Sequence, residues 1–182
     1  MIRWILWAFG GLLLGGVVHL ATVLLLPRTA VQDAYARLTP IAPVNTVVPI
    51  PAANAESTLI PFTDPAFVAA VCRYDLAAGP LKLTAPVTPA YTSVTFYSRR
   101  GVAFYALNDR AAGRRVIELD LMTTQQRADL PDEEDVTAAD RLIVESPTMT
   151  GLILLRALAP EPGLIPRARE ALLQAKCEMQ QP

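Results

Sequence analysis

Residues 4–26 decide the architecture of the chain, and they read WILWAFGGLLLGGVVHLATVLLL. None of these 23 residues is charged at neutral pH, and His19 is the only one that can be protonated. At 1.5 Å per residue the stretch reaches about 34 Å as a helix, enough to cross the hydrocarbon core of a bilayer. We therefore predict one transmembrane helix over residues 4–26, after a short tail of residues 1–3.

A cleaved signal peptide is the alternative interpretation of this stretch, because Ala34, Tyr35 and Ala36 resemble an A-x-A cleavage site after an apolar run. Two features favour the anchor. The apolar run is longer than the roughly 7 to 15 residues usual in a signal peptide, and the charged residues Arg28 and Asp33 lie between the run and the candidate site.

The orientation of the helix is nearly balanced by charge, because Arg3 and the terminal amine oppose Arg28 and Arg37. The very short tail and the two cysteines that follow the helix favour a cytoplasmic tail and an oxidising space for the rest of the chain. We expect a single-pass inner-membrane protein whose soluble domain lies in the periplasm.

One face of the predicted helix carries small and polar residues at spacings of three and four, which are Ala8, Gly11, Gly15, His19 and Thr22. Gly11 and Gly15 form a GxxxG pair, and His19 can hydrogen-bond a neighbouring helix. The stripe thus predicts contact with a second membrane helix. The alternative is that glycine is simply frequent in membrane helices.

Residues 27–63 are expected to be a juxtamembrane segment and a proline-rich linker. Within residues 39–63, five prolines occur among few charges, at positions Pro40, Pro43, Pro49, Pro51 and Pro61. This composition is typical of an extended spacer rather than of a packed element.

Residues 64–182 are long enough for one domain, and their pattern is mainly β. Asp64 and Pro65 predict a helix through Val71, and Thr123 with Gln126 forms a capping box. Predicted strands cover residues 81–87, 91–98, 102–108, 114–121, 141–146 and 151–157. An apolar face predicts a terminal helix through Leu164, Ala168, Ala171, Leu172, Ala175 and Met179. The fold class is α+β: an antiparallel β-sandwich-like domain with a C-terminal helix.

The charge balance excludes nucleic acid as a partner. The chain has 16 Lys plus Arg and 17 Asp plus Glu. Arg3, Arg28, Asp33 and Arg37 lie before residue 39. Residues 39–182 therefore carry 13 positive and 16 negative charges, a net of −3. Binding to phosphates needs a basic surface. The sequence also has no motif for a metal, a cofactor or nucleophilic catalysis, because its only histidine lies in the apolar stretch.

Catalysis would have to use carboxylates, and those nearest to predicted strand ends are Asp75, Asp109 and Asp120. Turn and capping chemistry is the simpler explanation of these residues. The acidic run of residues 132–135 lacks the spacing and the glycine of a calcium loop. Tyr91, Tyr97 and Tyr105 are candidates for binding a small ligand, and the pairs Arg99–Arg100 and Arg114–Arg115 are candidates for lipid phosphates.

Cys72 and Cys177 are the only cysteines, so at most one intramolecular disulfide can form. An oxidising compartment favours that disulfide. The alternative is two buried thiols that act as small apolar side chains.

Several segments together resemble the bacterial family called domain of unknown function 1254. They are residues 72–76 and 79–81, residues 91–97, residues 105–110, and Gly15, Gly16 and His19 in the anchor. The resemblance spans nearly the whole chain and implies an integral membrane protein of Gram-negative bacteria with a β-rich extracytoplasmic domain and no assigned activity. Longer members are similar in being followed by a second module, domain of unknown function 1214, for which this chain is too short. No catalytic residue carries over.

Three hypotheses for function follow. The leading one is a non-enzymatic, membrane-anchored accessory or binding protein of the envelope, part of a heteromer with a second membrane or periplasmic protein. The second is a periplasmic enzyme of carboxylate type that acts on an envelope glycan or lipid. The third is a small-ligand binder.

Overall fold

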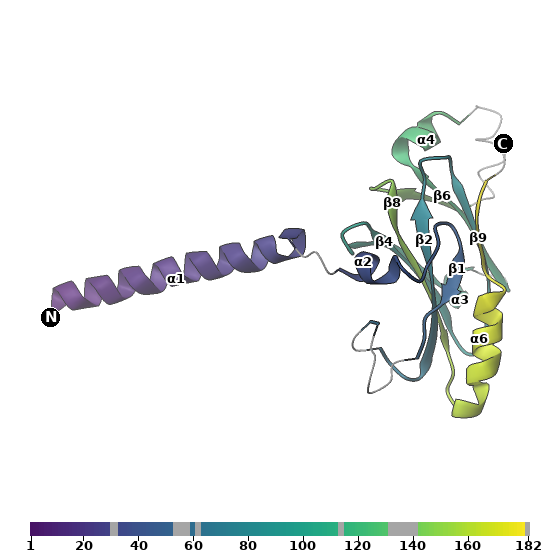
Figure 1. Cartoon of the computed structure of the whole chain (residues 1–182), viewed down its shortest axis with the longest axis horizontal. Helices are drawn as coiled ribbons and strands as arrows, with labels where there is room; N and C mark the ends of the chain where they lie inside the picture. Colours follow the sequence, from purple (N-terminus) through teal and green to yellow (C-terminus); the bar gives the residue numbers. More distant parts are fainter. Residues whose placement is uncertain (30–32, 53–58, 61–62, 113–114, 131–141, 181–182) are drawn as a thin grey trace. The chain divides into compact units, whose positions relative to one another are not determined.

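The computed structural model describes residues 1–29, 33–52, 59–60, 63–112, 115–130 and 142–180. The chain forms two compact units, Met1–Asp33 and Ala34–Pro182. Figure 1 shows the helix of the first unit and the two sheets of the second.

The first unit is one helix, α1 (Ile2–Thr29), which contains the predicted span. Its segment Ile2–Leu26 is long and apolar enough to cross a membrane by length and composition. Thr22 is the one hydroxyl of the predicted stripe, and its Oγ1 donates to the carbonyl oxygen of Val18 at 2.8 Å. The helix therefore satisfies this polar group internally, as an apolar surrounding requires.

The second unit contains two sheets. The first sheet has the order β1-β2-β8-β4-β5, and all of its pairs are antiparallel. Its strands are β1 (Val47–Pro49), β2 (Phe67–Asp75), β8 (Thr150–Leu158), β4 (Thr92–Ser98) and β5 (Ala103–Asn108). The second sheet has the order β7-β6-β3-β9, in which only the β6–β7 pair is parallel. Its strands are β7 (Ile143–Ser146), β6 (Val116–Thr123), β3 (Leu81–Pro86) and β9 (Lys176–Met179).

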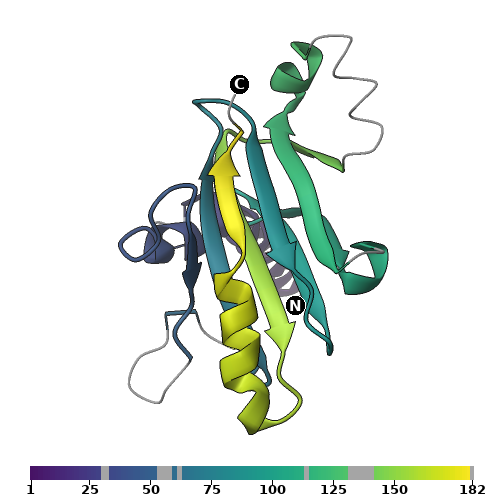
Figure 2. The same ribbon diagram turned by 90° about the vertical axis from the view of Figure 1, so that its right-hand side faces the viewer.

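Short helices precede the first strand or connect later strands. They are α2 (Ala34–Leu38), α3 (Asp109–Ala112), α4 (Thr124–Ala128), the 3-10 helix η1 (Pro162–Leu164) and α6 (Ile165–Leu173). Figure 2 shows that α6 leads directly into β9. The capping box at α4 is confirmed, because Thr123 Oγ1 accepts from the Gln126 amide and the Gln126 side chain accepts from the Thr123 amide.

Both sheets contribute to one apolar core. In β3, Leu81, Leu83 and Ala85 are buried and alternate with more exposed neighbours, as a sheet with one wet face requires. Phe96 of β4 and Ile153 of β8 are fully buried in the same core. This arrangement confirms the α+β class and the six strands predicted between residues 81 and 158, within a few residues at each end.

The helix predicted after Asp64 is wrong, because residues 67–75 form strand β2. Asp64 does accept a hydrogen bond from the Ala66 amide at 2.9 Å, but this closes a turn and not a helix. Strand β2 is paired along all nine residues with β8 and along three with β1. These ladders, together with the β-branched Val68 and Val71, outweigh the local helix signal.

Part of the predicted spacer is also packed. Strand β1 pairs with β2, and the side chains of Leu38, Ala42 and Ile50 are buried against Val71 and Leu152 on the outer face of the first sheet. Pro49 fits because β1 is an edge strand, where the missing amide hydrogen breaks no ladder. The outer face of the first sheet is therefore covered around β2 and β8.

The predicted terminal helix is too long. Helix α6 ends at Leu173, and residues 176–179 form strand β9, which pairs with β3. Lys176 and Glu178 are exposed while Cys177 is buried, which is the two-residue period of a strand. Ala175 and Met179 fitted the helical spacing by coincidence.

Candidate functional site

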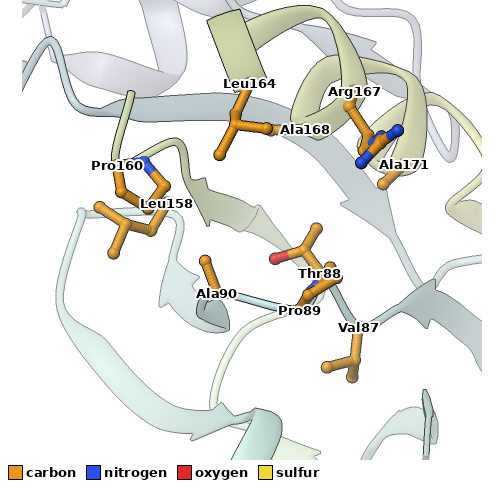
Figure 3. A pocket seen from close by; sticks show the side chains of 10 residues that line it. All are labelled: Val87, Thr88, Pro89, Ala90, Leu158, Pro160, Leu164, Arg167, Ala168 and Ala171. Atoms are coloured by element: carbon orange, nitrogen blue, oxygen red, sulfur yellow. The ribbon is translucent and has the colours of Figure 1, made fainter. Parts of the chain in front are cut away.

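A cavity of about 280 Å³ lies between α6, the end of β8 and the connection from β3 to β4. Ten side chains line it: Val87, Thr88, Pro89, Ala90, Leu158, Pro160, Leu164, Arg167, Ala168 and Ala171. Figure 3 shows Leu164 and Ala168 on one side and Ala90, Pro89 and Thr88 on the other. The space exists because alanines stand where larger side chains would meet across the gap.

The polar groups of this cavity are few. Thr88 is buried, and its hydroxyl is used within the turn: Oγ1 donates to the Tyr91 carbonyl at 3.2 Å and lies 2.9 Å from Thr92 Oγ1. Arg167 is exposed on α6 and is the one charged residue of the lining. The ion pairs Lys82–Glu118 and Arg127–Glu145 do not include Arg167. An apolar hollow with a guanidinium beside it is suited to a ligand that has an apolar chain and an anionic head group.

The candidate carboxylates Asp75 and Asp109 lie far apart. Asp75 is level with Thr150 at the start of β8, whereas Asn108, next to Asp109, pairs with Ser93 and so lies level with Arg156. Six residues of strand separate these levels by about 20 Å. Asp75 Oδ1 accepts from the Ala77 amide at 2.9 Å, which is turn chemistry. Asp120 is buried in the other sheet, level with Lys82.

The three candidate tyrosines are also dispersed. Tyr97 packs with the cluster on the outer face of the first sheet, and Tyr105 packs with the core between the sheets. The carbonyl of Tyr91 accepts from the Leu158 amide, which places Tyr91 near the far end of β8 from Tyr97. These residues do not form a common binding site.

The remaining charged candidates are the acidic run and the two arginine pairs. The acidic run 132–135 and Arg114 lie outside the described residues. Among the residues that the structure does describe, no group of three or more His, Cys, Asp or Glu is placed to hold a metal ion. Arg99 stacks on Tyr35 of α2, with its guanidinium carbon 4.0 Å from the ring centroid, and Arg73 lies 5.2 Å from the same ring. These contacts tie α2 to the sheet.

A buried hydroxyl cluster was not anticipated from the sequence. Tyr74 is fully buried, and its Oη lies 2.9 Å from Ser146 Oγ and 3.3 Å from the Tyr97 carbonyl oxygen. Ser146 Oγ donates to the Thr148 carbonyl at 2.6 Å. Burial raises the pKa of Tyr74, and the side-chain hydrogen bonds with Ser146 and Thr148 oppose that rise. The cluster joins β2 and β4 of one sheet to β7 of the other, so its role is to hold the sheets together.

The two cysteines are bonded in the structure, with their Cα atoms 6.5 Å apart. Cys72 belongs to β2 and Cys177 to β9, so the bond joins the two sheets. The residues of the predicted helix stripe, Ala8, Gly11, Gly15, His19 and Thr22, all lie exposed on α1.

The family model described as "Protein of unknown function (DUF1254)" matches residues 44–180. The chain belongs to the DUF1254 family. The matched region begins at the bridge between Val44 and Arg73 and ends after β9, so it coincides with the two sheets and α6. The DUF1254 match leaves α1 and α2 outside it. No curated protein matches the chain.

Two solved structures are similar in fold to this DUF1254 protein. The VPA0106 protein from Vibrio parahaemolyticus is 14% identical with a TM-score of 0.58, and the match covers 81% of this chain and 34% of that one. A putative uncharacterized protein from Burkholderia cenocepacia is 15% identical with a TM-score of 0.52, covering 81% of this chain and 37% of that one. The DUF1254 chain thus spans about a third of the length of each, and the likeness shows the fold alone.

Proposed function

We propose that this DUF1254 protein is a single-pass inner-membrane protein whose periplasmic domain binds a second envelope polypeptide as a non-enzymatic accessory. The length and composition of α1 support the anchor, although a signal sequence passes the same test. The Cys72–Cys177 bond supports an oxidising compartment. The separation of Asp75 from Asp109 speaks against a carboxylate pair acting on a glycan or lipid.

The observation that carries the proposal is the edge strand β5. Proteins usually protect sheet edges with charge or proline. Three of the four outer strands follow this rule: β1 contains Pro49, β7 contains Glu145, and β9 contains Lys176 and Glu178. Strand β5 reads AFYALN, has no charge and no proline, and exposes Ala103 and Ala106. An extended segment of a partner can extend the sheet there by main-chain hydrogen bonds.

The test is photo-cross-linking in native membranes from a photoreactive residue placed at Ala106. A matched control places the same residue at Ala128, which is exposed on α4 away from the edge. We expect a cross-link to a second, different polypeptide from position 106 and at least fivefold less from position 128. In a chain tagged for purification, Ala106→Lys should lower recovery of that polypeptide at least fivefold, and Ala128→Lys should not, because strand pairing would bring the new charge into the interface.

Equal cross-linking from both positions would contradict an interface at β5. A product of twice the mass of the chain would identify a second copy as the occupant and would exclude the accessory role proposed for this edge.

We further propose that α1 contacts a membrane helix of the same partner through Ala8, Gly11, Gly15, His19 and Thr22. A Cβ atom added at Gly11 or Gly15 meets nothing within 4 Å, so leucine fits on α1 itself. Gly11→Leu with Gly15→Leu should preserve insertion and lower partner recovery, since the close approach of two helices is lost. Gly10→Leu, which lies off the stripe, is the control, and unchanged recovery in the double variant removes the helix from the proposal.

A further inference from the structure

The cavity between α6 and the end of β8 has no part in the proposed accessory role, which rests on β5 and α1. Its lining combines mainly apolar side chains with one cationic side chain, Arg167. Leu158, Pro160 and Leu164 form one part of the wall, and Val87, Pro89 and Ala90 form another. The Thr88 hydroxyl is already hydrogen-bonded to Tyr91 and Thr92. Water held there would find few partners, so an apolar group is the more favourable occupant.

Among the described residues that line this apolar space, only Arg167 is charged. Figure 3 shows its side chain next to Ala171 on α6. The neighbouring acidic residues of the segment, Glu161 and Glu170, make no ion pair with it within the part of the chain that the structure describes. A guanidinium offers a planar pair of N–H donors that matches a carboxylate. The geometry therefore provides a head-group contact at one side of an apolar hollow.

The cavity is partly open to solvent, so its volume sets the size of the part of an occupant that it can hold. The cavity measures about 280 Å³. At roughly 30 Å³ for each water-sized unit this corresponds to about nine such units, close to the size of a chain of about eight to ten carbons. The nearly all-carbon wall favours an aliphatic chain over a sugar or a nucleotide, because buried polar groups of those ligands would lack partners.

We propose that this cavity binds the aliphatic chain of a medium-length carboxylic acid, with Arg167 contacting its carboxylate.

The probe for the test is a straight-chain ten-carbon acid with a photoreactive diazirine near its apolar end. It is applied to the full chain in phosphatidylcholine nanodiscs, and the labelled peptides are mapped by mass spectrometry. The matching ten-carbon alcohol carries the same chain without the charge. Mapping separates labelling of the cavity from labelling of α1 by probe dissolved in lipid.

In the wild-type chain we expect label on residues 87–90 and 158–171. Arg167→Gln should lower labelling by the acid about tenfold and leave labelling by the alcohol unchanged, since only the charge-assisted contact is removed. Arg169→Gln on the same helix removes an exposed arginine that does not line the cavity, and it should change neither. Ala171→Leu should lower labelling by both probes at least fivefold because the side chain occupies the space.

Equal labelling by the acid in wild type and Arg167→Gln would overturn the head-group contact, and undiminished labelling in Ala171→Leu would overturn the cavity as the site. Thermal unfolding of each variant checks that the domain remains folded. Ala106→Lys should leave labelling unchanged, so failure of this inference and failure of the accessory role are separate results.

Discussion

The two ends of strand β8 differ in how they are filled. At its start, Gly151 lies against Tyr74, and the Tyr74 hydroxyl hydrogen-bonds the hydroxyls of Ser146 and Thr148. At its end, Leu158 lines a hollow whose other walls contain alanines and one arginine. Seven residues separate these positions, about 23 Å along a strand. The hydroxyl cluster at the start of β8 holds the two sheets together. Because of this, unfilled space at the end of β8 costs the fold little stability.

The largest expected effect comes from the disulfide, which joins β2 to the strand that follows α6. Replacing Cys72 and Cys177 by Ala opens a crosslink with a sequence separation of 105. The crosslink lowers the conformational entropy of the unfolded chain, which contributes at most about 4 to 5 kcal/mol to the free energy of unfolding. We expect chemical denaturation to show a loss of this order, with amide hydrogen exchange rising first in α6 and β9 and only later at Tyr74.

Mass spectrometry of the unreduced protein tests the bond itself. Two alkylatable thiols in native protein taken from cells would contradict both the disulfide and the periplasmic location that it supports.

The next effect is at the filled end. A Cβ atom at Gly151 would lie 2.3 Å from the Tyr97 carbonyl oxygen and 2.4 Å from Tyr74 Oη. Gly151→Ala should therefore cost about 3 kcal/mol of unfolding free energy, because backbone and a fully buried ring must move. Gly163→Ala in η1 is the matched control, since a Cβ there meets nothing within 4 Å. A loss of unfolding free energy below about 0.5 kcal/mol for Gly151→Ala lies in the range of a neutral surface change. It would show that the packing around Gly151 and Tyr74 adjusts without strain.

A smaller, pH-dependent effect is expected at Tyr74. Its pKa is raised from 10.0 by burial, so the unfolded chain releases this proton at lower pH than the folded one. The stability linked to Tyr74 is therefore fully present below pH 10 and is lost as the pH rises above it. Tyr74→Phe should flatten this alkaline decline while costing about 1 to 2 kcal/mol at pH 7. Urea denaturation between pH 7 and pH 11 measures both, and an unchanged alkaline slope in the variant would assign the decline to other groups.

Local patterns were sufficient for much of the fold. Strand β6 alternates Glu118 and Asp120 with Ile117, Leu119 and Leu121, and such a period is visible without tertiary information. Strand β2 was missed because the turn at Asp64 and Pro65 looks like a helix start, and only the ladders with β8 and β1 decide against it. Strand β9 was missed because Ala175 and Met179 extend the spacing of α6.

The candidate site was largely beyond prediction. The cavity is made by small side chains from three segments that are distant in sequence, and no local pattern marks a space. Arg167 is one of two arginines on an ordinary amphipathic helix, and only its place beside the cavity distinguishes it. The contact of Tyr74 with Ser146 joins residues 72 positions apart, so it too requires the fold.

The central place of β8 in the first sheet has a consequence for synthesis. Strand β2 pairs with β8 from Asp75 with Thr150 to Phe67 with Leu158, so even the first residue of its main partner is made only 75 residues after β2 ends. At roughly 5 to 20 residues per second this takes about 4 to 15 s. Throughout that interval the apolar strand FVAAVCRYD has an unpaired edge. The nascent chain therefore needs protection from aggregation until its eighth strand emerges.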